Sequence, residues 1–138
     1  MSDFVLDCSA TLPWVFASEA TPATDALLDE LAAGRRAWVP ALWHLEVANV
    51  MLGARKRGQI DRAGVEKFMS TLRTLEIEVD DETMSVAWTR TMGLGESYGL
   101  TAYDAAYLEL ALRRGLPLAS LDGALRKAGQ KAGCRLLP

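Results

Sequence analysis

The chain has 138 residues, of which 50% are hydrophobic and 24% are charged, which is enough for one compact domain with a core, over residues 1–138. No apolar stretch approaches the roughly 18 residues of a membrane span, and the N-terminal residues are acidic, so we expect a cytoplasmic protein with no membrane partner. The net charge of −3 argues against a protein that coats nucleic acid, but not against an enzyme that cuts it.

Cysteine and histidine are too sparse for a zinc site or a disulfide scaffold. Cys8 and Cys134 do not form a CxxC pair, and His44 is the only histidine. A single bridge between Cys8 and Cys134 stays open.

In chain order, the first half of the sequence alternates short apolar runs with longer segments of helical periodicity. The runs predict strands at residues 4–6 and 37–39. Helices are predicted in this half at residues 9–17, 24–33 and 42–57.

The second half continues the same alternation. Strands are predicted at residues 77–79, 116–121 and 135–137. Helices are predicted at residues 61–75, from Asp80 or Asp81 to residue 91, at 102–114 and at 123–132, with a glycine-bearing loop at 93–99. Strands separated by helices predict an α/β domain with a mostly parallel central sheet flanked by helices.

In such a domain, sites form where the carboxyl ends of the strands meet. Asp7 and Asp122 each follow a predicted strand, although a single Asp in this position more often caps the next helix. Asp104 lies three residues after Thr101, which is also the spacing of a capping box.

Glu46 is harder to explain structurally. On a helix, its neighbours three and four residues away are mostly apolar, and no Lys or Arg lies within one turn. A partly buried carboxylate needs a cation or hydrogen-bond donors to offset its desolvation.

Taken together, Asp7, Glu46, Asp104 and Asp122 can gather at one rim of the sheet. Carboxylates so close repel one another unless a divalent ion neutralises them, and oxygen ligands favour Mg²⁺, with Mn²⁺ as a substitute. Such a site supports hydrolysis of a phosphodiester.

Polar and basic neighbours complete this prediction. Hydroxyl and amide groups that could orient the acids lie two or three residues from them, at Ser9, Asn49 and Ser120. The basic residues that follow Asp122 are our first choice for contact with RNA phosphates, namely Arg126, Lys127 and Lys131. The four tryptophans are expected mostly in the core, with Trp14 nearest a partner surface.

With these residues in hand, the chain resembles the PIN-domain family, and within it the VapC toxins of type II toxin–antitoxin pairs. The resemblance covers nearly the whole chain and depends on four segments in order. They are Asp7-Cys8-Ser9, Pro40 to Val50 with Glu46 and Asn49, Leu100 to Ala111 with Asp104, and Leu118-Ala119-Ser120-Leu121-Asp122. Many relatives have Thr where this chain has Ser120, a mild departure because either hydroxyl can donate.

The resemblance implies a Mg²⁺-dependent endoribonuclease that cuts RNA and is neutralised by a cognate VapB-type antitoxin. Carried over by position, Asp7, Glu46, Asp104 and Asp122 would hold the metal. Members are usually homodimers, and the antitoxin's tail places a basic side chain at the acidic pocket.

Two other classes of function are weighed against this one. A PIN-like binding module without cleavage would act only through its partner, and retention of all four acids speaks against it. A phosphotransfer domain is disfavoured, because a haloacid-dehalogenase-like enzyme needs a second Asp where Ser9 stands, and a receiver needs a lysine for which the sequence offers no clear candidate.

Overall fold

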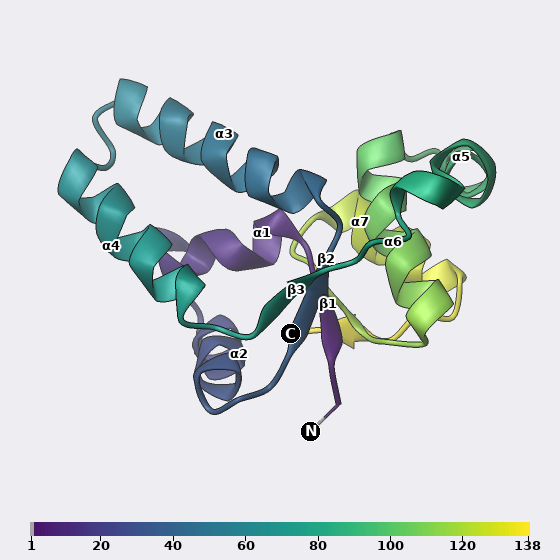
Figure 1. Ribbon diagram of the computed structural model, residues 1–138, viewed down its shortest axis with the longest axis horizontal. Coiled ribbons are helices and arrows are strands. Elements are labelled where there is room, and N and C mark those ends of the chain that lie inside the picture. Colours follow the sequence, from purple (N-terminus) through teal and green to yellow (C-terminus); the bar gives the residue numbers. More distant parts are fainter. Residues whose placement is uncertain (1) are drawn as a thin grey trace.

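The computed structural model describes residues 2–138, and the strands in this range form one parallel sheet (Figure 1). Each strand is short because only two or three residues of each apolar run are paired. The strands are β1 (Phe4–Leu6), β2 (Ala37–Val39), β3 (Ile77–Val79), β4 (Leu118–Ala119) and β5 (Leu136–Leu137). The predicted α/β class is confirmed, and all of the pairings are parallel.

β1 is the central strand of the sheet, whose order is β3-β2-β1-β4-β5. Val5 lies opposite Trp38 of β2 on one side and opposite Leu118 of β4 on the other. The strand order therefore reverses between β1 and β4, which is where α/β sheets open a crevice at the carboxyl ends of their strands. Asp7 and the segment from Ser120 to Asp122 follow these two strands.

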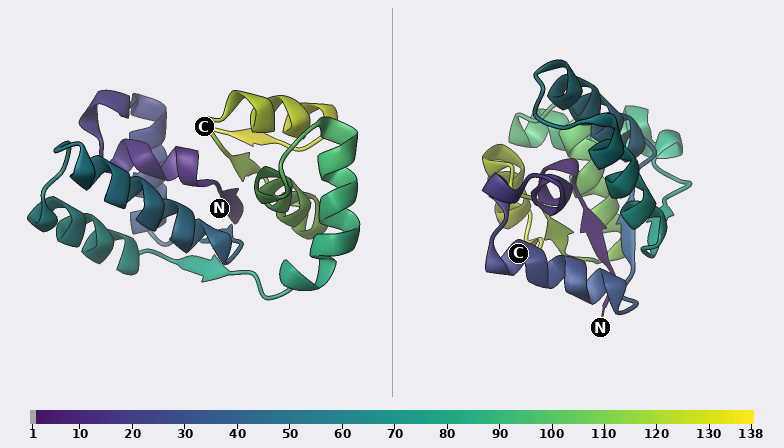
Figure 2. Two further views of the ribbon diagram at one scale, coloured as in Figure 1. Left: turned by 90° about the horizontal axis from the view of Figure 1, so that it is seen from above. Right: turned by 90° about the vertical axis from the view of Figure 1, so that its left-hand side faces the viewer.

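The helices lie in two groups, with α1–α4 on one side of the strands and α5–α7 on the other in Figure 1; Figure 2 shows the same grouping from above. The α-helices are α1 (Cys8–Thr11), α2 (Pro22–Ala32), α3 (Leu42–Lys56), α4 (Arg62–Arg73), α5 (Met92–Tyr98), α6 (Ala102–Arg114) and α7 (Gly123–Lys131). Short helical turns join them at η1 (Leu12–Trp14), η2 (Ala17–Glu19), η3 (Met84–Val86) and the π-helical η4 (Ala87–Thr91).

Helix α6 is the central helix of the core. Every residue from 105 to 111 is buried, and the helix packs against β1 and β4. The Thr101 hydroxyl caps its start by accepting from the Asp104 amide at 3.1 Å, and Gly115 ends it in the left-handed region at φ 65°. Asp104 therefore occupies a firmly held first turn.

The predicted loop at residues 93–99 is wrong, because this segment is helix α5. Its glycines have other roles than breaking a helix. A Cβ at Gly95 would lie 3.0 Å from the Leu100 carbonyl oxygen, so only glycine allows the chain to fold back this closely. Gly99, at φ 66°, ends the helix.

The tryptophans are less buried than the sequence predicted. Trp43 is buried and Trp14 is half-buried, but Trp88 on η4 is 88% exposed. Cys8 and Cys134 are both free thiols. None of the helices that the structure describes is long and apolar enough to cross a membrane.

Candidate functional site

Asp7 is the first residue after β1, and its side chain is held from two directions. Its Oδ2 accepts hydrogen bonds from the Ser9 hydroxyl at 2.6 Å and from the Ser120 hydroxyl at 2.8 Å. Asp7 is only 4% exposed, and this burial raises its pKa, which the two hydroxyls offset only in part. A hydrogen bond from the Cys8 backbone also opposes the rise in the pKa of Asp7.

The two serines also bind the backbone beyond β4. The Leu121 amide donates to Oγ of Ser9 at 2.8 Å, and the Asp122 amide donates to Oγ of Ser120 at 3.1 Å. Ser9 therefore contacts Asp7, the acid near which the sequence placed it, whereas Ser120, which the sequence paired with Asp122, donates to Asp7 and accepts from the Asp122 amide. Asn49 does not share this arrangement, since its side chain is exposed on α3.

Glu46, on the second turn of α3, has the hydrogen-bond donor that the sequence did not identify. The hydroxyl of Tyr107, a fully buried residue of α6, donates to Oε1 of Glu46. Burial raises the pKa of Glu46, the tyrosine hydroxyl opposes this rise, and the charges of Asp7 and Asp104 add to it. Tyr107 fixes the Glu46 side chain without neutralising it.

A sequence signal for Tyr107 did exist. It lies three residues after Asp104, so the two side chains project from neighbouring turns of one helix face. The contact with Glu46 still depends on the packing of α6 beside α3, which is a tertiary relationship.

Asp104 is only half explained as a capping residue. Its amide donates to the Thr101 hydroxyl, but its carboxylate does not accept a hydrogen bond from the Thr101 amide. Within residues 2–138 the carboxylate has no hydrogen-bond donor and no ion pair. Burial raises the pKa of Asp104, and the charges of Asp122 and Asp7 raise it further.

Asp122 does cap a helix, as the simpler interpretation expected. Its Oδ2 accepts from the Leu125 amide at 2.9 Å, at the start of α7. The other carboxylate oxygen stays free of this bond. A capping role and a role at an ion site are therefore compatible for Asp122.

The four acids lie close enough to influence one another. Asp122 raises the pKa of Asp7 and Asp104, and Asp7 and Asp104 raise the pKa of Glu46. In the part of the chain that the structure describes, none of the four forms a salt bridge with Lys or Arg. The charge gathered here therefore has no neutralising partner among the side chains of residues 2–138.

The donor set matches a hard divalent cation, although the side chains do not form a finished cage. No three Asp, Glu, His or Cys side chains within residues 2–138 lie together closely enough to hold a metal ion as they stand. Mg²⁺ does not need such a group, because it typically binds one or two carboxylates and fills its other positions with water and phosphate oxygens. The carboxylate of Asp104, which has no hydrogen-bond donor within residues 2–138, fits this requirement.

Cys8 lies beside the acids but is not a nucleophile there. Burial raises the pKa of its thiol to about 12, with further contributions from the charges of Glu46 and Asp7. Since the thiolate is the reactive form, the environment suppresses thiol chemistry at this site.

The predicted RNA-contact residues on α7 are not equivalent. Nη1 of Arg126 donates to the backbone oxygens of Ser120 at 2.8 Å and Leu137 at 3.0 Å, so this arginine ties the ends of β4 and β5 together. Lys127 and Lys131 are exposed. Contact with RNA stays a prediction for all three, and the two lysines are the freer cations.

A buried ion cluster lies at the end of β3, away from these acids. Asp80 has a fully buried side chain and pairs with Arg113 at 2.7 Å and Arg114 at 3.0 Å, while Arg113 also pairs with Glu109. Burial alone would raise the pKa of Asp80, but the donors from Arg113, Thr83 and Arg114 hold it well below its usual range. The local sequence does not reveal this cluster, because Asp80 and Arg113 are 33 positions apart in the chain.

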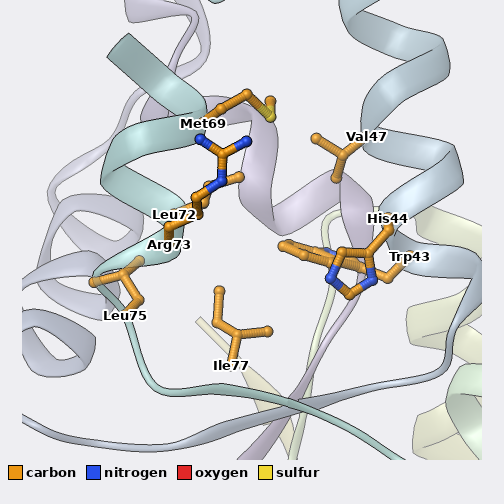
Figure 3. Close-up of a pocket in the computed structure, with 8 residues that line it drawn as sticks. All are labelled: Trp43, His44, Val47, Met69, Leu72, Arg73, Leu75 and Ile77. Carbon is orange, nitrogen blue, oxygen red and sulfur yellow. The ribbon is translucent and has the colours of Figure 1, made fainter. Parts of the chain in front are cut away.

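The pocket between α3 and α4 does not contain the acids. It has a volume of about 250 Å³, and Trp43 and Val47 of α3 face Met69 and Leu72 of α4 across it (Figure 3). Its lining residues include no carboxylate. The chemistry at the carboxyl ends of β1 and β4 is therefore separate from this apolar pocket.

Comparison with known proteins agrees with the α/β fold described above. Several solved structures are similar in fold at low sequence identity. PAE2754 from Pyrobaculum aerophilum is 20% identical, with a TM-score of 0.67 over 92% of this chain and 84% of that one. FitAcB from Neisseria gonorrhoeae is 18% identical, with a TM-score of 0.60 over 98% and 96%.

VapBC-5 from Mycobacterium tuberculosis, described as a member of a family of toxin–antitoxin systems, is 19% identical, with a TM-score of 0.57 over 99% of this chain and 98% of that one. A search of curated protein sequences finds no match. The family model of the PIN domain matches residues 4–131, a range that contains all four acids. The chain therefore belongs to the PIN domain family.

Proposed function

We propose that this protein is a Mg²⁺-dependent endoribonuclease, the toxin of a type II toxin–antitoxin pair, and that a cognate VapB-type antitoxin neutralises it. One observation carries the proposal. Four carboxylates gather at the carboxyl edge of the sheet, after β1, on α3, on α6 and at the start of α7, without a salt-bridge partner in residues 2–138. Burial and the charges of neighbouring acids raise the pKa of Asp7, Glu46 and Asp104. Such a cluster is suited to a divalent cation.

Asp7, Glu46, Asp104 and Asp122 are the residues that would hold the ion. Bound Mg²⁺ would activate a water molecule for attack on a phosphodiester and stabilise the charge on the leaving oxygen. Asp7 is held in place by Ser9 and Ser120, whose hydroxyls both donate to its Oδ2. Glu46 is presented by Tyr107. Rigid presentation of this kind lowers the reorganisation needed at the moment of reaction.

The comparisons support the toxin–antitoxin part of the proposal. VapBC-5 is described as a member of such a system, and a similar structure from Rickettsia felis, at 14% identity and a TM-score of 0.60, is VapBC2 bound to a DNA fragment from its promoter. We propose by the same analogy that the protein forms a homodimer and that RNA is its substrate.

The test is cleavage of single-stranded RNA by the purified protein with Mg²⁺, with Mn²⁺ and with EDTA. The wild type should cut only with a divalent ion, and Asp104→Asn should lose cleavage. Asp81→Asn is the matched control, because Asp81 is exposed and does not belong to the site. Metal-independent cleavage, or full activity in Asp104→Asn, would contradict the proposal. RNA binding without any cleavage would favour a binding module instead.

A further inference from the structure

A second recess lies between the segment after α1 and the C-terminal half of α3, and none of the four acids lines it. It has a volume of about 620 Å³, which is within the usual range for ligand pockets. Leu12, Phe16 and the exposed Glu19 come from one wall, and Val50, Arg57 and Gln59 come from the other. We call it the Phe16–Arg57 groove.

Both walls of this groove begin at the acidic site. Helix α1 starts directly after Asp7 and leads into the wall that contains Phe16, and α1 contacts α3. On α3, the spacing of Glu46, Val50 and Arg57 places them along one side of the helix. The rise from Glu46 to Arg57 is about 16 Å, so a single strand with its phosphate at Glu46 reaches the groove within a few nucleotides.

A glycine inside α3 lies next to the Arg57 side chain. Gly53 lies one turn before Arg57, and a Cβ there would lie 3.2 Å from Nη1 of Arg57. Glycine inside a helix costs about 1 kcal/mol relative to alanine. At this position it makes room for the guanidinium against the helix surface, where Nε and Nη2 of Arg57 also donate to the Gln59 side chain at 3.2 and 3.1 Å.

The chemistry of the groove suits an unpaired nucleotide. Phe16 is half-buried and supplies a ring on which a base can stack. Arg57 has no ion pair within residues 2–138, and the exposed Arg55 and Lys56 extend its positive charge at the end of α3. Gln59, an amide that both donates and accepts, lies at the same end.

We propose that the Phe16–Arg57 groove binds an unpaired nucleotide of the RNA, a few nucleotides from the bond that is cut. The base stacks on Phe16, and its phosphate pairs with Arg57. This inference rests on the proposed ribonuclease function and adds where the substrate lies. It favours single-stranded RNA because a paired base cannot leave its stack to enter the groove.

The test measures the affinity of the full-length protein for a fluorescent single-stranded RNA in EDTA, where cleavage does not occur. Phe16→Leu should raise the Kd by roughly 5- to 100-fold, whereas Phe16→Tyr, which keeps the ring, should stay near the wild type. Arg57→Gln should make the salt dependence of binding shallower, with the slope of log association constant against log salt concentration smaller in magnitude by about 0.7. Arg62→Gln is the matched control, since Arg62 is exposed on the same hairpin but does not line the groove.

A Kd within twofold of the wild type for both Phe16→Leu and Arg57→Gln would overturn the inference, as would an equal loss in Arg62→Gln. Unchanged RNA affinity with weaker antitoxin binding would assign the groove to the protein partner and also overturn it. Binding is measured in EDTA and therefore does not depend on cleavage. A wild type that binds RNA through the groove but never cuts it would contradict the proposed function, while the inference about the groove would still hold.

Discussion

The hydroxyl of Ser120 donates to Oδ2 of Asp7 at 2.8 Å, and the two residues are 113 positions apart in the chain. This bond joins the ends of β4 and β1 at the point where the strand order reverses. Both residues are buried, so water cannot replace a lost partner. The acidic site and the centre of the sheet are therefore stabilised by the same contact.

Ser120→Ala should lower the free energy of unfolding by about 1–3 kcal/mol, because it removes a donor from a buried carboxylate. Urea denaturation in EDTA measures this change. Ser85→Ala is the matched control, since the Ser85 hydroxyl makes only an exposed bond to the Glu82 backbone. Equal stability of Ser120→Ala and the wild type would show that the bond does not hold the strand ends together.

Tyr107→Phe should weaken Mn²⁺ binding and RNA cleavage by roughly 10- to 100-fold, because it removes the group that orients Glu46. Calorimetry gives the Mn²⁺ affinity independently of activity. Tyr103→Phe, on the same helix but with Tyr103 67% exposed, should leave both quantities unchanged. If Tyr107→Phe binds Mn²⁺ as tightly as the wild type, the positioning role of Tyr107 is wrong.

The acidic site should make the metal-free protein less stable as the pH rises. The raised pKa values of Asp7, Glu46 and Asp104 mean that the folded state holds protons more tightly than the unfolded state above their ordinary pKa of about 4. The free energy of unfolding therefore falls as the pH rises from that value through the raised pKa values.

Asp104→Asn, which carries no titrating group at this position, should flatten this fall, and added Mg²⁺ should restore stability to the wild type. Denaturation curves in EDTA at several pH values measure the effect. The lowered pKa of Asp80 has the opposite pH dependence but is shared by both proteins, so it cancels in their difference. Parallel pH profiles for the two proteins would contradict the prediction.

The cluster at Asp80 should be important for stability rather than for metal binding. Asp80→Asn leaves Arg113 and Arg114 without their buried partner and should cost about 3 kcal/mol of unfolding free energy. Glu82→Gln removes an exposed partner of Arg113 at 3.4 Å and should cost at most about 0.5 kcal/mol. A loss of Mn²⁺ affinity in Asp80→Asn at a temperature where it is fully folded would show that the cluster also supports the site.

Local sequence was sufficient to predict the strands and to single out four acids, whose role as metal ligands stays a prediction. Phe4 to Leu6 is an apolar run followed at once by Asp7, and Thr101 with Asp104 marks the start of a helix. These features depend on neighbours in the chain. The prediction of a loop at residues 93–99 was wrong because the glycines were interpreted as helix breakers. Gly95 instead packs closely against the backbone of Leu100.

The missed features depend on residues far apart in the sequence. Tyr107 reaches Glu46 across 61 positions, and Arg113 reaches Asp80 across 33. No local pattern shows which helices lie side by side. The hydrogen-bond donor of Glu46 and the role of Arg113 therefore required the tertiary structure.

The central claim is that Asp7, Glu46, Asp104 and Asp122 together bind a divalent cation. Calorimetric titration of Mn²⁺ into the metal-free protein tests it most directly. The wild type and Asp81→Asn should bind the ion with equal affinity, and Asp7→Asn and Asp104→Asn should each bind it at least about tenfold more weakly. No binding by the wild type, or the same affinity in all of these proteins, would contradict the claim.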